Sequence, residues 1–104
     1  MIDAKDITEQ IESDFGEKAT LVNQILDKAI SKTDYLNCDR IIRCILFLAD
    51  KDIDKLYRSI ETAIYDPRDV ILRAEYTDLG QTQTPRRIRD FNKTFDHADK
   101  DVKE

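Results

Sequence analysis

The sequence has 104 residues, of which 40% are hydrophobic and 38% charged, and its net charge is −5 at pH 7. This length fits one domain and leaves no room for two, and two glycines with two prolines are too few for the turns of an all-β fold. The negative charge also disfavours a polyanionic partner. We therefore predict an all-α fold, a small bundle of four or five short helices.

A first helix is predicted over residues 3–15. Apolar residues recur there at four-residue spacing: Ile7, Ile11 and Phe15. Asp3 or Asp6 is suited to cap the start of this helix, because a carboxylate can accept the unpaired N–H groups of the first turn.

Gly16 interrupts this pattern, although the apolar stripe continues in phase as far as Ala29. One long helix that carries Gly16, at a cost of about 1 kcal/mol, is therefore an alternative. We favour two helices with a break at Gly16, the second over about residues 17–32.

The central helix is predicted over residues 38–49, where apolar residues cover most of the circumference. Asp52 is suited to cap a fourth helix over residues 53–65, whose predicted inner face is Ile53, Leu56, Tyr57, Ile60 and Ile64. A fifth helix begins at Pro67 with Asp66 as its cap, because proline suits the first helical position.

The sequence divides into a helical domain over residues 1–79 and a polar C-terminal segment over residues 80–104. Within the segment, a short helix at 85–95 can dock on the domain through apolar side chains, namely Ile88, Phe91 and Phe95. Residues 96–104 are expected to fray, because few apolar side chains remain to hold them.

No catalytic or cofactor motif is present, and we expect a protein that is not an enzyme and has no cofactor and no metal site. Cys38 and Cys44 are six residues apart, which places them on different faces of one helix. Cys44 is expected in the core. His97 is the single histidine, and its acidic neighbours are too generic to indicate zinc.

The strongest candidate interaction patch lies in the basic stretch at residues 86–93. Its residues are Arg86, Arg87, Arg89, Phe91 and Lys93. Arginine can bind phosphate or carboxylate with two parallel bonds, and a nearby aromatic ring can stack on a base. The alternative is structural, with the segment docked on the core and its arginines paired with the acidic N-terminal half. That half, residues 1–34, carries eight acids and four bases.

Arg40 and Arg43 form a secondary candidate, because they are three residues apart and share one face of the central helix. They could line a groove for an anionic partner. The structural alternative is pairing with Asp39 and neighbouring acids.

These observations favour a non-catalytic protein-interaction module, serving as an adaptor, an inhibitor or a subunit of an assembly. The partner is expected to be another protein, with a homodimer left open. The alternative function is nucleic-acid or phosphate binding through residues 86–93. A cytoplasmic location without membrane contact is expected, since the longest apolar run, Cys44–Ala49, has six residues.

Overall fold

The computed structural model of the chain describes residues 4–76 and 87–98. Its helices confirm the all-α class, and the only β pairing among the described residues is an isolated bridge between Tyr76 and Arg87. The elements in chain order are α1 (Lys5–Phe15), η1 (Gly16–Lys18), α2 (Ala19–Lys32), η2 (Asp34–Leu36), α3 (Asp39–Ala49), α4 (Ile53–Tyr65) and α5 (Pro67–Glu75), where η marks a short 3₁₀ helix.

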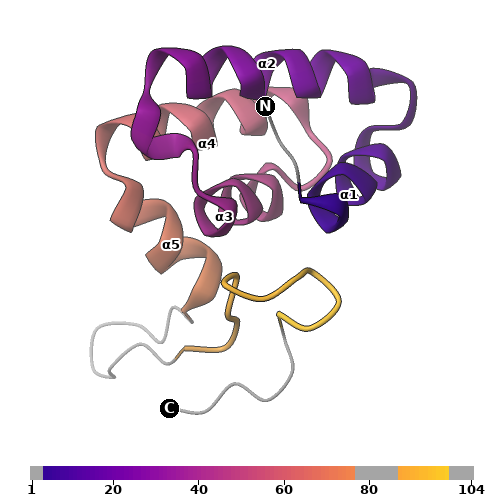
Figure 1. Cartoon of the computed structure of the whole chain (residues 1–104). Helices are drawn as coiled ribbons and strands as arrows, with labels where there is room; N and C mark the ends of the chain where they lie inside the picture. The colour runs from indigo at the N-terminus through magenta and orange to yellow at the C-terminus, as the bar shows by residue number, and fades with distance from the viewer. Residues whose placement is uncertain (1–3, 77–86, 99–104) are drawn as a thin grey trace.

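Helix α3 lies at the centre of the bundle, as its apolar circumference predicts. It contacts α1, α4 and α5, and α2 passes above it (Figure 1). Most of its residues are buried, namely Ile41, Ile42, Arg43, Cys44, Ile45, Leu46 and Ala49. The buried Arg43 is the exception to the apolar rule, and it requires a partner inside the protein.

The starts of α4 and α5 follow from their capping residues. One Asp52 carboxylate oxygen accepts the N–H groups of Asp54 and Lys55 at 2.8 and 3.2 Å. The Asp66 carboxylate accepts the N–H of Arg68 at 3.1 Å, and Pro67 occupies the first turn of α5. The sequence predicted both caps correctly.

The start of α1 differs from the sequence expectation. Its N-cap is Ala4, which supplies no capping side chain, and the Asp6 carboxylate instead binds residues distant in the sequence. Asp3 lies outside the described residues. Because its carboxylate pairs with Arg43 in the folded protein, Asp6 does not cap α1 as its position in the sequence suggests.

The break at Gly16 is confirmed. Gly16 has φ +51° and ψ −117°, a conformation almost confined to glycine, and its N–H donates to the carbonyl oxygen of Glu12. One turn of 3₁₀ helix follows, so α2 begins only at Ala19. The chain therefore turns between α1 and α2 (Figure 1).

The described part of the C-terminal segment, residues 87–98, docks beneath α3 and α5 (Figure 1). It forms turns and not the expected helix at 85–95, while residues 85, 86 and 99–104 lie outside the described part. The carbonyl oxygen of Glu75 accepts two N–H groups, from Ile88 at 2.7 Å and from Arg89 at 3.1 Å. These bonds hold the segment in an extended path that a helix cannot follow.

Candidate interaction surface

A buried carboxylate, Glu75, anchors the C-terminal segment to the bundle. Arg40 donates to both of its oxygens, from Nε at 2.9 Å and from Nη2 at 2.6 Å. Arg87 Nη2 lies 3.1 Å from the same carboxylate, and the N–H of Phe91 donates to it at 3.0 Å. The hydrogen bond to Glu75 raises the pKa of Arg40 above its usual value, so the guanidinium stays charged.

A second ion pair joins Arg43 of α3 to Asp6 of α1. Arg43 Nε and Nη2 each donate to a separate Asp6 oxygen at 2.9 Å. Arg43 Nη1 also donates to the carbonyl oxygen of Phe91 at 3.1 Å, and Asp6 accepts the N–H of Phe95 at 3.2 Å. Burial alone would raise the pKa of Asp6, but these hydrogen bonds and the charge of Arg43 lower it below 3.8.

The other residues of the predicted basic patch also make internal contacts where the structure describes them. The Arg89 guanidinium lies 4.3 Å from the centre of the Phe47 ring and donates to the carbonyl oxygen of Ala74 at 3.2 Å. Phe91 is only 2% exposed. Lys93 is half-buried, and Arg86 lies outside the described residues.

The structure thus brings Arg40, Arg43, Arg87 and Arg89 together around the docked segment. The acids that pair with Arg87 are Glu75 and Asp90, and not acids of the N-terminal half as the structural alternative expected. Sequence spacing gave no signal for Glu75, because its partners lie 35 and 12 residues away along the chain.

The two cysteines differ in accessibility. Cys44 is fully buried, as expected, and burial followed by the charge of Glu75 raises the pKa of its thiol to about 12. Cys38 is an exposed free thiol just before α3. Within residues 4–76 and 87–98, no group of three or more His, Cys, Asp and Glu side chains could hold a metal ion.

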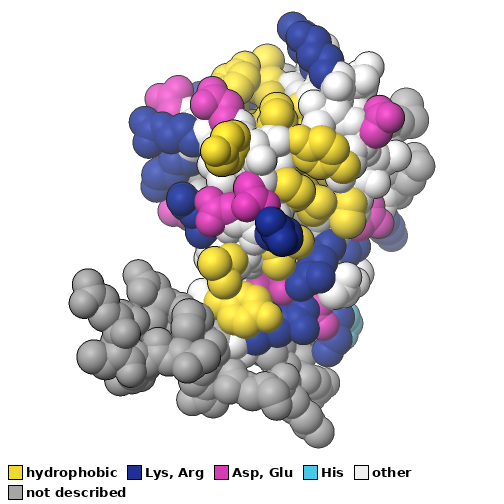
Figure 2. Space-filling view, turned by 90° about the vertical axis from the view of Figure 1, so that its left-hand side faces the viewer, with side chains coloured by type: hydrophobic (Ala, Val, Ile, Leu, Met, Phe, Trp, Pro, Cys, Tyr) yellow, Lys and Arg dark blue, Asp and Glu magenta, His cyan; other side chains and the backbone are white. Residues whose placement is uncertain are grey.

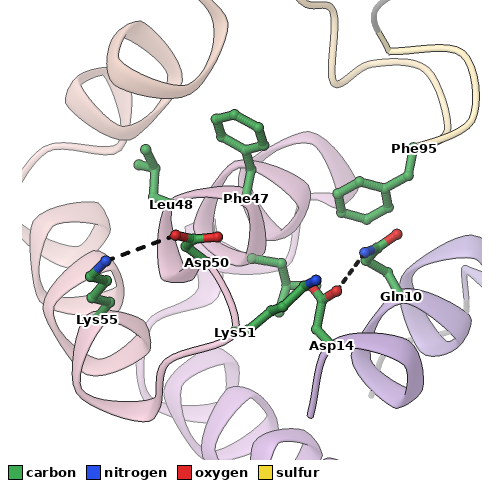
Figure 3. A pocket seen from close by; sticks show the side chains of 9 residues that line it. Gln10, Asp14, Phe47, Leu48, Asp50, Lys51, Lys55 and Phe95 are labelled. Atoms are coloured by element: carbon green, nitrogen blue, oxygen red, sulfur yellow. Dashed lines mark hydrogen bonds and ion pairs between the residues drawn. The ribbon is translucent and has the colours of Figure 1, made fainter. Parts of the chain in front are cut away.

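A hollow of about 470 Å³ opens between α1, the end of α3, the start of α4 and the C-terminal segment (Figure 3). The rings of Phe47 and Phe95 form its apolar side. Four of its polar side chains form two pairs, Gln10 with Asp14 at 2.8 Å and Lys55 with Asp50 at 3.9 Å, and Lys51 also lines it. This pairing leaves a mixed surface without a concentrated charge.

A second hollow, of about 270 Å³, lies between α2 and α4 and is mainly apolar. We call it the α2–α4 groove, and its lining residues are Ile25, Lys28, Ala29, Lys32, Tyr57 and Ile60. The core side chains of α2, Val22, Leu26 and Ile30, belong to the same apolar stripe as Ile25 and Ala29. The groove therefore lies along the edge of this stripe, where Ile25 and Ala29 are only partly buried.

Exposed apolar side chains continue from the groove to the end of α4. Tyr57 is 48% exposed, Ile64 41% and Tyr65 92%. Tyr35 of η2 is 50% exposed, and its hydroxyl donates to the carbonyl oxygen of Ile64, which places η2 against the end of α4. Hydrophobic side chains gather over the upper part of this side of the molecule (Figure 2).

We call this surface the tyrosine face and define it by Ile25, Ala29, Tyr35, Tyr57, Ile60, Ile64 and Tyr65. Sequence reasoning assigned Tyr57 and Ile64 to the inner face of α4, but only Leu56, Ile60 and smaller side chains are buried there. The apolar stripe of α4 is wider than the core can cover. The width of this stripe is the feature of the sequence that could have indicated an exposed apolar surface on α4.

Comparison of the chain with protein-family models, curated proteins and solved structures finds no match. Among the described residues, no helix combines the length and the apolar character that crossing a membrane requires.

Proposed function

We propose that this protein is a non-catalytic interaction module that binds another protein through its tyrosine face. The observation that carries the proposal is the position of three of the four tyrosines, Tyr35, Tyr57 and Tyr65, on this face with 48% or more of each side chain exposed. Tyrosine is enriched in protein interfaces because it combines a large apolar ring with a hydroxyl that can still bond at the edge.

The surroundings of the tyrosines support the same proposal. Ile25, Ala29 and Ile60 give the face an apolar floor, and Ile64 extends it to the end of α4. Single exposed apolar residues are normal on a soluble protein, but a contiguous apolar surface is characteristic of a site that another molecule covers. We place the protein in the cytoplasm as part of this proposal, consistent with its two free thiols.

The alternative, nucleic-acid or phosphate binding through residues 86–93, has less support. A phosphate would have to compete with Glu75 for Arg87 and with the Phe47 ring for Arg89. Binding of this kind would weaken steeply with salt, because it depends on displacing ions from the phosphates. Binding through the mainly apolar tyrosine face should weaken far less over the same increase in salt.

Capture of partners from a native lysate tests the proposed function. The bait is the whole chain, compared with a Tyr57→Ser, Ile64→Ser variant. The matched control is Leu72→Ser, Ile88→Ser, which removes two apolar side chains of similar exposure, 50% and 38%, outside the tyrosine face. Circular dichroism establishes that each variant is folded.

We expect a specific protein, identified by mass spectrometry, to be retained by the wild type and the control and lost with the tyrosine-face variant. Retention by all three would contradict the tyrosine face as the binding site. Recovery of nucleic acid that moderate salt removes would favour the alternative function.

A further inference from the structure

The shape of the α2–α4 groove favours a helical occupant. Its two walls run in the same direction (Figure 1), and on each wall the apolar positions recur three or four residues apart, at 25 and 29 on α2 and at 57 and 60 on α4. The exposed Ile64 continues the α4 row beyond the groove, seven residues after Tyr57. Seven residues of helix rise about 10 Å, which is two turns. A third helix with apolar residues at i, i+3, i+4 and i+7 would present a ridge of this length.

An extended strand suits the groove less well. Strand addition requires a sheet edge with unpaired backbone N–H and C=O groups, and the backbone groups within a helix already bond to one another. Both walls of the groove are helices, so they offer side chains only.

The charge of the groove is one-sided. Lys28 and Lys32 line it from α2, four residues apart and hence on one face, and none of the described lining residues is an acid. Within residues 4–76 and 87–98, neither amine has a carboxylate oxygen within 4.0 Å. A chain with a net charge of −5 thus carries a locally positive rim beside an apolar floor.

From this combination we propose that the occupant is an amphipathic helix of another protein, with two acidic residues at i and i+4 on the flank that faces Lys28 and Lys32. Its apolar residues lie against Ile25, Tyr57 and Ile60. The acids match the lysine spacing, since four residues rise about 6 Å on both helices. This inference rests on the proposed function, because the groove is part of the tyrosine face.

Two libraries of displayed 16-residue helical peptides provide the test. Both vary the apolar positions, and the flank positions are fixed as Glu in one library and as Lys in the other. Each is selected on the wild-type chain and on a Lys28→Glu, Lys32→Glu variant. The matched control is Lys51→Glu, Lys55→Glu, which reverses two exposed lysines outside the groove.

We expect the wild type and the control to enrich the Glu library, and the groove variant to enrich the Lys library. A selected Glu peptide should bind the groove variant at least about tenfold more weakly than it binds the control, because like charges then face each other. Tyr57→Ser, Ile64→Ser should abolish binding of the same peptide.

Equal enrichment of both libraries would overturn the acidic-helix inference, while binding that still requires Tyr57 and Ile64 would leave the proposed function intact. The acidic-helix inference would also be overturned if no selected peptide required these two residues. Self-association of the chain through this face, lost in the Tyr57→Ser, Ile64→Ser variant, would overturn it as well. The capture of partners from native lysate tests the proposed function independently of these peptide selections.

Discussion

Arg43 and Asp6 are 37 residues apart in the sequence and are joined by two hydrogen bonds of 2.9 Å each. The same two side chains bind the carbonyl oxygen of Phe91 and the N–H of Phe95. One ion pair thus connects α1, α3 and the C-terminal segment. The described arginines that suggest anion binding, Arg40, Arg43, Arg87 and Arg89, mostly make contacts within the protein that stabilise the docked segment.

Arg43→Met should lower the free energy of unfolding by about 3 kcal/mol, because it leaves the Asp6 carboxylate without its buried partner. Urea denaturation followed by circular dichroism measures this change. The control is Lys55→Met, which removes an exposed pair of 3.9 Å and should cost no more than about 1 kcal/mol. Equal losses in the two variants would contradict the structural role of Arg43.

Glu75→Gln should loosen the docked segment. The new amide would turn an NH₂ group toward the Arg40 or Arg87 guanidinium, in place of a carboxylate oxygen that accepts from Arg40 and lies 3.1 Å from Arg87 Nη2. Hydrogen exchange at the Phe91 amide should become at least about tenfold faster, in line with a loss of 1.4 kcal/mol or more from a broken buried pair. The comparable change Asp69→Asn affects an exposed pair and should leave Phe91 unchanged. An unchanged Phe91 exchange rate in Glu75→Gln would rule out this anchoring role.

Acid should release the Asp6 contacts. The folded pKa of Asp6 lies below its ordinary value of 3.8, so the unfolded chain takes up the proton first as the pH falls. The stabilisation is complete above about pH 5 and is lost progressively through pH 3.8 and below. NMR of the Phe95 amide across this range measures the loss. The Asp6→Asn variant should lack this part of the pH dependence, and a persistent transition there would assign it to another group.

The two cysteines should react in a fixed order. In the native protein at pH 8, a thiol reagent such as iodoacetamide should modify Cys38 and spare Cys44, because Cys44 is buried and its thiol has a pKa of about 12. In urea both should react. Mass spectrometry of the peptides separates the two sites, and native modification of Cys44 would show that α3 opens readily.

Local sequence signals were sufficient to predict most of the helices. The caps at Asp52 and Asp66 and the break at Gly16 depend on neighbours within a few residues, and all three are present in the structure. The helix expected at 85–95 does not form among the described residues, because the N–H groups of Ile88 and Arg89 donate to the carbonyl oxygen of Glu75 at the end of α5. Tertiary partners, which a single sequence does not reveal, decide such a segment.

The functional surface was harder to predict for the same reason. An apolar stripe identifies the residues that could be buried, but the neighbouring helices decide which of them are. On α4 the core covers Leu56 and Ile60 and leaves Tyr57 and Ile64 half exposed. Glu75 presented the opposite difficulty, because a charged residue near a helix end is normally solvent-exposed, and here it is fully buried.

Site-specific photocrosslinking distinguishes binding through the tyrosine face from binding through residues 86–93. Benzoylphenylalanine replaces Tyr57 in the tyrosine face or Ile88 in the basic segment of an otherwise unchanged chain, and each protein is irradiated in native lysate. We expect a discrete crosslinked protein from position 57 and none from position 88. Crosslinks from position 88 alone, to protein or to nucleic acid, would rule out the tyrosine face as the binding site.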